Sequence, residues 1–216
     1  MRLKQQLFLT LLCALPVTLP AQDELEPPDV DFFAAIQGTH TDYRNLGAEH
    51  ATGARITLGT WMNEIHRGDF QFALEGSFNW MGESDRDRRF TETAPQEEFL
   101  DRDVKENTSI ETNGLSLGAR MLHEDTAFLR AGVLFYTMQE TIRQNRVFNP
   151  QDPTEEPTSD SQRDSSRITG TAPYIGAGFQ MPLGGTSLNL IMDYSAYWLE
   201  SERVEGFSVG LSYRIQ

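Results

Sequence analysis

Apolar and polar residues alternate along much of this chain. Between residues 70 and 80, large apolar side chains or Gly occupy every second position, with Gln, Ala, Glu, Ser and Asn between them. An alternation of period two predicts a β-strand with one apolar face. The same pattern covers residues 114–121, 129–136, 188–198 and 207–215, and weaker versions cover 30–41, 52–63 and 167–181. We therefore predict an all-β chain of eight strands.

The connections between these strands differ in length. Short turns are expected at 64–68, 123–126 and 182–186, whereas about 10, 27 and 24 residues join strands 1–2, 3–4 and 5–6, and about six join the last two. Short turns at one rim and long polar loops at the other are typical of outer-membrane barrels, and an even strand count lets the sheet close without an edge. The prediction is an eight-stranded antiparallel up-and-down transmembrane β-barrel over residues 30–216.

Alternation alone does not say which face of a barrel is apolar. A soluble lipocalin-like barrel that binds a ligand inside has the same strand count and the opposite orientation. Two features favour the membrane barrel. The positions between the apolar residues are mostly small, which suits a crowded interior, and aromatic residues gather near strand ends, as membrane interfaces require. These aromatics are Phe32, Phe33, Trp61, Phe70, Trp80, Tyr174, Phe179, Trp198 and Phe207.

The first 21 residues have the features of a cleaved signal peptide. Arg2 and Lys4 precede an apolar stretch at 7–15, Pro16 and Pro20 interrupt it, and Ala21 is a suitable last residue before cleavage. Residues 22–29 then form a short N-terminal segment before the barrel. The rest of the chain has no apolar run of 18 residues, so a helical membrane protein is excluded. We expect export to the cell outer membrane, among its lipids and lipopolysaccharide.

Charge and composition exclude several functions. The formal net charge of −14 disfavours nucleic acid as a partner, because binding to phosphates needs a basic surface. The only Cys, Cys13, lies in the leader, and the histidines (His40, His50, His66 and His123) are scattered. We expect no cofactor and no transition-metal site.

At this point the chain resembles the small outer-membrane β-barrels of Gram-negative bacteria, OmpA-like or OmpX-like. The resemblance rests on the architecture, on the segment 32–38 (FFAAIQG) that opens the first strand, and on the closing segment 207–216 (FSVGLSYRIQ). It implies insertion by the barrel-assembly machinery and residence in the outer membrane. Members of this group act as anchors, adhesins, small pores or lipid-modifying enzymes, so the resemblance does not fix one function.

Two patterns could indicate catalysis. Residues 206–210 match G-x-S-x-G, but that motif works on a strand-to-helix turn, and here it lies inside an alternating strand. His40, Thr41 and Asp42 could supply half of a base–orienter pair for a lipid-modifying outer-membrane enzyme. No clear set of catalytic residues accompanies either pattern. We therefore predict a non-enzymatic protein and keep the lipid-modifying enzyme as the alternative.

Two long polar segments, 83–109 and 143–166, are predicted to be extracellular loops that carry any surface recognition. They are rich in charge, Ser, Thr and Pro, and lie outside the two-residue period. Asp85-Arg86-Asp87 and Asp101-Arg102-Asp103 resemble the start of a calcium loop, but Arg89 and Lys105 stand where an EF-hand requires an acid or amide. Binding of a divalent cation beside lipopolysaccharide stays open.

The last expectation concerns the interior of the barrel. Eight strands enclose a lumen that side chains fill, so a wide pore is not expected. The alternation points six charged residues inward, where buried charges need partners. They form the expected lumen charge cluster: Arg55, Glu75, Arg120, Arg130, Asp193 and Arg214.

Overall fold

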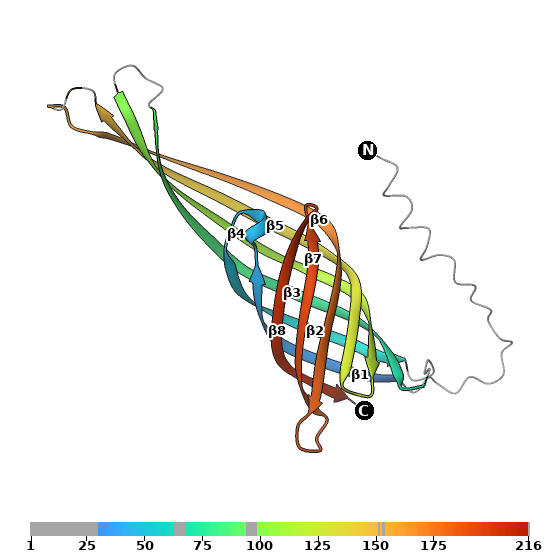
Figure 1. The fold of residues 1–216 in the computed structure, drawn as a ribbon. Coiled ribbons are helices and arrows are strands. Elements are labelled where there is room, and N and C mark those ends of the chain that lie inside the picture. Colours follow the sequence, from blue (N-terminus) through green and yellow to red (C-terminus); the bar gives the residue numbers. More distant parts are fainter. Residues whose placement is uncertain (1–29, 63–67, 94–98, 151, 153, 216) are drawn as a thin grey trace, which may run out of the picture.

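The fold is a closed barrel of eight antiparallel strands in which each strand pairs with its neighbours in sequence and the last with the first (Figure 1). The computed structural model describes residues 30–62, 68–93, 99–150, 152 and 154–215, so the expected signal peptide and the segment 22–29 lie outside the described residues. The all-β prediction is confirmed. The strands are β1 Val30–Asp42, β2 His50–Met62, β3 Phe70–Thr93, β4 Phe99–His123, β5 Ala127–Pro150, β6 Thr158–Pro182, β7 Leu188–Leu199 and β8 Glu202–Ile215.

Closure of the barrel depends on the pairing of β1 with β8. The ladder runs from Phe32 opposite Ile215 to Asp42 opposite Glu205. This ladder gives the first and last strands, β1 and β8, hydrogen-bond partners on both sides, so the ring has no free edge. No helix among the described residues is long and apolar enough to cross a membrane.

Large apolar side chains form a belt on the outer face of the barrel. Leu58, Leu117 and Ile36 are 64%, 62% and 60% exposed, and apolar side chains on all eight strands share this orientation. The inward positions are buried and hold small or polar residues, paired charges, and two apolar clusters described below. Other strongly exposed members of this apolar belt are Ile56, Leu74, Phe78, Leu115, Leu129, Val133, Phe135, Ile175, Phe179, Val209 and Leu211. Three of the aromatics expected at the membrane interface, Phe33, Trp61 and Tyr174, instead point inward and are buried.

The segments 83–109 and 143–166, predicted as loops, are largely strand. β3 and β4 pair from Glu83 opposite Glu111 to Thr93 opposite Asp101, and β5 and β6 pair out to Phe148 opposite Thr158. With the β4–β5 ladder they form a four-stranded sheet that projects far beyond the rest of the barrel (Figure 1). We call this part the projecting sheet. In the ladders of the described residues, β3 beyond Trp80 and β6 before Tyr174 pair on one side only.

The transition from barrel to projecting sheet on β3 is a bulge. The register with β4 shifts between Trp80 and Glu83, and Gly82 in this interval has φ +86°, a value that favours glycine. The extra residue reverses the phase of β3. Odd positions such as Glu75 point inward in the barrel, whereas Ser84 and other even positions continue that face beyond Gly82.

Two turns at opposite ends of the barrel are tight. The β4–β5 turn has three residues, Glu124, Asp125 and Thr126, the first two with φ of 49° and 56°. The β7–β8 turn consists of Glu200 and Ser201, whose φ of 48° and 71° suit a two-residue hairpin. The β7–β8 turn is therefore two residues long rather than the six predicted from the sequence. The β1–β2 connection contains a 3₁₀ turn, η1 (Arg44–Leu46).

Three layers of side chains fill the lumen. At the end that bears the projecting sheet, Tyr43, Met81, Ile110 and Leu199 belong to one buried apolar cluster. At the end with the short turns, a second cluster contains Phe33, Trp61, Ala73, Leu122, Phe128 and Ile191. Between them lies a layer of charged and hydrogen-bonding side chains. This filled interior agrees with the expectation for eight strands.

Candidate functional site

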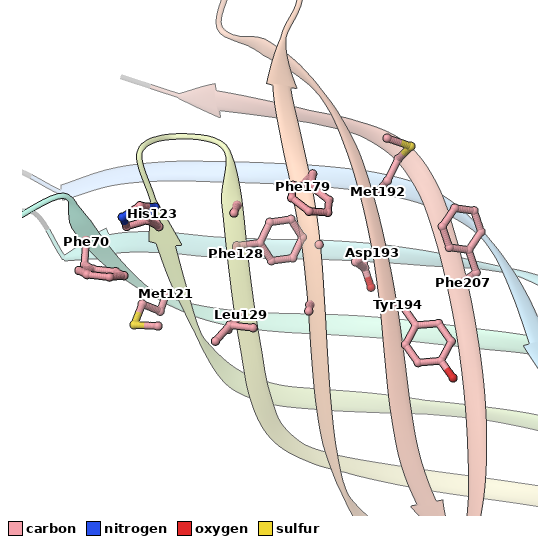
Figure 2. Close-up of a pocket in the computed structure, with 13 residues that line it drawn as sticks. Phe70, Met121, His123, Phe128, Leu129, Phe179, Met192, Asp193, Tyr194 and Phe207 are labelled. Carbon is pink, nitrogen blue, oxygen red and sulfur yellow. The ribbon is translucent and has the colours of Figure 1, made fainter.

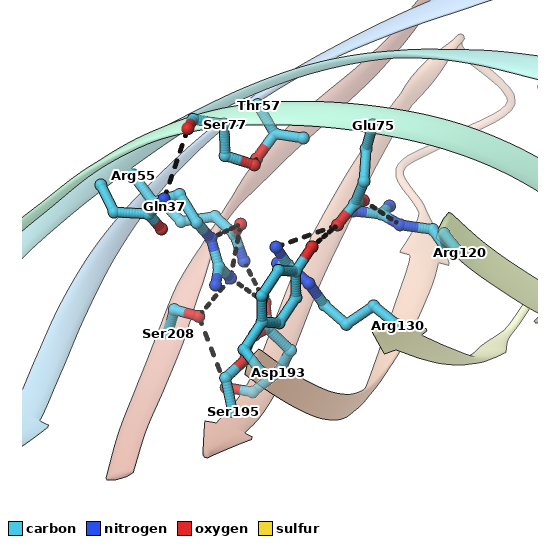
Figure 3. A network of polar contacts seen from close by, with 12 residues as sticks. Gln37, Arg55, Thr57, Glu75, Ser77, Arg120, Arg130, Asp193, Ser195 and Ser208 are labelled. Atoms are coloured by element: carbon cyan, nitrogen blue, oxygen red, sulfur yellow. Dashed lines mark hydrogen bonds and ion pairs between the residues drawn. The ribbon is translucent and has the colours of Figure 1, made fainter. Parts of the chain in front are cut away.

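The charged layer in the middle of the barrel is the most concentrated polar site among the described residues. Five of the six residues expected in the lumen cluster meet there: Arg55, Glu75, Arg120, Arg130 and Asp193 (Figure 3). Each comes from an inward position of a different strand, β2, β3, β4, β5 and β7, and none is more than 4% exposed. The alternation of the strands therefore brings together charges that are far apart in sequence.

Glu75 is the acceptor for one half of the layer. Arg120 donates from Nε to Glu75 Oε2 over 2.9 Å, and its Nη2 lies 2.8 Å from the same oxygen. Arg130 Nη2 lies 2.9 Å from Glu75 Oε1. One carboxylate thus joins the guanidinium groups of two neighbouring strands across the lumen.

Asp193 is the acceptor for the other half. Arg55 forms a short ion pair with Asp193 Oδ2, and Ser195 donates to Oδ1 over 3.0 Å. Gln37 on β1 donates from Nε2 to Asp193 Oδ2 over 2.7 Å and accepts from Arg55 Nη2 over 2.9 Å. Gln37 and Ser208, which accepts from Arg55 over 2.6 Å, complete this network. The sequence-based prediction of the lumen cluster considered charged residues alone and therefore left out Gln37, although this residue occupies an inward position of the first strand.

Aromatic rings supply contacts that the carboxylates do not. The guanidinium carbon of Arg120 lies 4.8 Å from the ring centre of Phe33 and 4.6 Å from that of Phe128. Arg130 lies 5.1 Å from the ring centre of Tyr174. Three guanidiniums share two carboxylates, and such ring contacts stabilise cations away from water. The layer is thus a packed structural core rather than an open polar channel.

Arg214 does not join this layer, contrary to the expectation. Its Nε and Nη2 donate to Asp31 Oδ2 over 3.0 and 2.5 Å near the end of the barrel with the short turns. The inward residue of β8 that reaches the charged layer is Ser208, and six residues of strand rise by about 20 Å. Arg214 lies too far along β8 to reach the layer. The alternation of a strand predicts which face a residue occupies but not its level along the barrel axis.

The patterns considered for catalysis do not form catalytic geometry. Ser208 of the G-x-S-x-G match lies within β8, is buried, and contacts Arg55. The ring of His40 stacks on that of His50 at 5.1 Å, and Asp42 Oδ1 lies 3.8 Å from Nδ1 of His50. Hydrogen bonds from Arg44 lower the pKa of Asp42 to about 2, so this carboxylate is engaged with Arg44. His66 lies outside the described residues.

One group of potential metal ligands was not foreseen from the sequence. Asp69, His123 and Glu124 carry ligand atoms within 4.8 Å of one another at the end with the short turns. The two turns are joined by the hydrogen bond from Glu124 N to Asp69 O, 3.1 Å long. Asp69 and Glu124 are exposed.

The acidic triplets of the projecting sheet are strands rather than cation-binding loops. In Asp85-Arg86-Asp87 the central arginine points to the other face and donates to the carbonyl of Gly47 over 3.1 Å. Asp87 accepts from Asn107 over 3.1 Å, and Asp103 from Thr91 over 2.7 Å. In an extended strand the two carboxylates of each triplet point to the same face of the sheet and do not surround an ion.

The outer wall of the barrel carries shallow apolar hollows. One, of about 460 Å³, lies near the short turns, where Ala127 and Ala177 leave space between larger side chains such as Met121, Phe179 and Phe207 (Figure 2). Asp193 and Phe128 contribute to it only from inward-facing positions. The hollow has the apolar chemistry of a lipid-facing surface.

No known protein-family profile and no curated protein sequence matches the chain. Several solved structures are similar to it, and they are small eight-stranded outer-membrane barrels. Ail of Yersinia pestis shares 14% identity over 86% of this chain and 97% of that chain, with a TM-score of 0.42; in complex with the heparin analogue sucrose octasulfate the values are 12% and 0.36. Neisserial surface protein A shares 10% identity over 85% and 96% of the two chains, TM-score 0.33. The β-barrel domain of Pseudomonas aeruginosa OprF shares 12% over 88% and 100%, TM-score 0.34.

Proposed function

We propose that this protein is an outer-membrane β-barrel with a side-chain-filled lumen that acts as a structural and surface-interaction protein. The barrel anchors the chain in the membrane, and the projecting sheet meets a partner outside the cell. The proposal includes export through a cleaved signal peptide at 1–21, insertion by the barrel-assembly machinery, and contact with outer-membrane lipids and lipopolysaccharide.

The apolar belt is the observation that carries this proposal. Large apolar side chains such as Leu58, Leu117 and Ile36 are more than half exposed on the outer wall, whereas charged residues occupy the interior. A water-soluble barrel would have the reverse arrangement, since contiguous exposed apolar surface of this extent is rare in soluble monomers. The belt therefore favours the membrane barrel over the lipocalin-like alternative.

The filled lumen supports an anchoring role rather than conduction or catalysis. Glu75 and Asp193 both form ion pairs with arginines, and apolar clusters fill the lumen on either side of them. The hydroxyl of Ser208 and the His40–His50 pair lie on opposite faces of the wall. A lipid-modifying enzyme would need a nucleophile and a base in contact on the lipid face, so this alternative has less support.

The projecting sheet supports the interaction role. Charged and polar residues cover its four strands, and the strands at its two sides pair with a neighbour on one side only. A hydrogen-bonded polar sheet beyond the belt offers its faces to a partner, as recognition segments on a structured scaffold do.

Fractionation and surface proteolysis test the proposal together. We expect the protein in the detergent-solubilised outer-membrane fraction, with a folded band that shifts on heating in gel electrophoresis. Protease added to intact cells is expected to cut the projecting sheet and leave a protected barrel. Recovery in the soluble periplasm, or cleavage only after the outer membrane is opened, contradicts the proposal.

A further inference from the structure

Two connections meet at the end of the barrel with the short turns and bring an imidazole beside two carboxylates. Asp69 is the last residue before β3, and Glu124 is the first residue after β4. His123, the last residue of β4, lies directly opposite Phe70, the first residue of β3. One ligand atom from each of Asp69, His123 and Glu124 lies within 4.8 Å of the other two. We call these three residues the turn triad.

The backbone fixes the relative position of the two carboxylates. Glu124 N donates to Asp69 O over 3.1 Å, so hydrogen bonding between the two chain segments continues one residue beyond the ladder. Glu124 has φ of 49°, which is a left-handed rather than an extended conformation. The strict alternation of side chains therefore ends at His123, and the Glu124 carboxylate is free to approach the imidazole. The fold, and not the spacing in the sequence, assembles the triad.

The imidazole is the most restrained member of the triad. The ring centre of His123 lies 4.7 Å from that of Phe70 at an angle of 46°, and Figure 2 shows the two rings side by side. His123 is half-buried, so its ring has less rotamer freedom to lose on binding a ligand. Asp69 and Glu124 are exposed, and small rotations of their side chains bring the donors to the separation of about 3.4 Å that tetrahedral coordination of zinc requires.

The charges of the triad also favour a cation. Among the described residues neither Asp69 nor Glu124 forms an ion pair, whereas Asp31 at the same end of the barrel pairs with Arg214. Two carboxylates held close together repel each other when both are ionised. A divalent ion between them removes this repulsion and adds the imidazole nitrogen as a third ligand.

We propose that the turn triad of Asp69, His123 and Glu124 binds Zn²⁺ and thereby joins the two turns. An imidazole nitrogen suits zinc and its neighbours among the transition metals, whereas Ca²⁺ and Mg²⁺ take oxygen ligands. Three protein ligands leave a coordination position for water, which the exposed site can supply. The sequence predicted no transition-metal site because its histidines are scattered, but this site needs only one of them. The inference goes beyond the proposed function, since the projecting sheet takes no part in it.

Calorimetric titration with Zn²⁺ tests the site on the full chain, produced without a histidine tag, folded in detergent and treated with a chelator. We expect Zn²⁺ binding that persists in excess Mg²⁺. His123→Gln is expected to lower the Zn²⁺ affinity at least about tenfold, since even changes behind the ligands of a metal cost that much. Glu124→Gln should also weaken binding. Because Glu124 is exposed, this second variant tests the site even if His123→Gln disturbs folding.

His50→Gln is the matched control. His50 is also an exposed histidine near a carboxylate, with 3.8 Å between its Nδ1 and Asp42 Oδ1, but it lies on β2 outside the triad. Its replacement is expected to change the Zn²⁺ affinity by less than about twofold, as for a distant and screened group.

Hydrogen exchange checks that the ion joins the two turns. Zn²⁺ should slow exchange of the Glu124 amide, which bonds Asp69, in the wild type but not in His123→Gln. No Zn²⁺ binding by the folded wild type, equal affinities of the wild type and the two triad variants, or an equal loss in His50→Gln overturns the inference. These outcomes leave the proposed function in place, since fractionation and surface proteolysis decide that separately.

Discussion

Glu75 on β3 and Arg130 on β5 meet inside the barrel, with 2.9 Å between Glu75 Oε1 and Arg130 Nη2, although β4 lies between their strands. Arg120 on that intervening strand binds the other oxygen of the same carboxylate. The side chains of three consecutive strands are thus tied together at one level of the lumen. Because this carboxylate is buried, its partners decide whether its charge stabilises or destabilises the barrel.

Replacement of either lumen carboxylate is expected to destabilise the barrel. Glu75→Gln leaves Arg120 and Arg130 without their shared acceptor, and Asp193→Asn leaves Arg55 without its ion pair. Loss of one partner of a buried ion pair costs about 3–5 kcal/mol, less where water reaches the lumen. Urea unfolding in detergent measures the change in free energy.

The matched control for these variants is Glu92→Gln on the projecting sheet. Glu92 also pairs with an arginine, Arg102, but its side chain is 41% exposed, so the expected loss is at most about 1 kcal/mol. Midpoints of Glu75→Gln and Asp193→Asn equal to the wild-type midpoint would show that the charged layer is hydrated and contributes little.

The sequence was informative where one face of a strand meets the lumen and the other meets the belt. Residues 70–80 alternate because Glu75, Ser77 and Asn79 point inward, whereas Leu74 and Phe78 point outward. Beyond Gly82 both faces of the sheet meet solvent, so polar residues occupy both and the period disappears although the strands continue. The bulge at Gly82 also reverses the phase, which no alternation count detects.

The membership of the charged layer was only partly predictable for a similar reason. Inward phase identified Arg55, Glu75, Arg120, Arg130 and Asp193, but the height of each residue depends on register, which long-range pairing fixes. Arg214 also occupies an inward position, but it lies nearer the end of the barrel with the short turns, where it binds Asp31. The neutral Gln37 escaped notice because it carries no charge, although it bridges Arg55 and Asp193.

The two faces of β3 are expected to tolerate arginine differently. Leu74 is 52% exposed in the apolar belt, so Leu74→Arg places a charge against lipid at a cost of about 2–4 kcal/mol near the bilayer midplane. Ser77 points into the polar lumen and bonds Thr57 over 2.9 Å, so Ser77→Arg should assemble better unless crowding intervenes. The fraction of heat-modifiable barrel in membranes measures assembly.

Ser77→Asp separates crowding from charge in that comparison. The Asp side chain is far smaller than Arg and carries a charge into the same lumen position. We expect its assembly to exceed that of Leu74→Arg. Equal assembly of Leu74→Arg and both Ser77 variants would mean that the outer wall does not face lipid.

The outer part of the projecting sheet, beyond Arg88 on β3 and Gln144 on β5, is expected to be dispensable for barrel assembly. Its β3–β4 and β5–β6 ladders extend beyond the ring, so joining Arg88 to Glu106 and Gln144 to Gln162 by two-residue turns removes paired strand without opening the barrel. Ser84 and Arg86, which bond Glu49 and Gly47, are retained. Heat-modifiable mobility of the shortened chain checks this, and failure to assemble would show that the outer part of the projecting sheet belongs to the folding unit.

Removal of one member of the Arg143–Arg163 pair is expected to stabilise the protein slightly. The two residues are direct cross-strand neighbours with like charge, and Arg163→Ser leaves a serine that suits the exposed edge of β6. Relief of such a pair is worth about 0.2–1 kcal/mol at low ionic strength. Because the projecting sheet can open before the barrel does, hydrogen exchange of the β5–β6 amides reports the change better than global unfolding. Arg146→Ser, which removes a charge from the other face, should not slow exchange. Faster exchange in Arg163→Ser than in the wild type would mean that Arg163 stabilises the sheet and that its pairing with Arg143 carries no electrostatic cost.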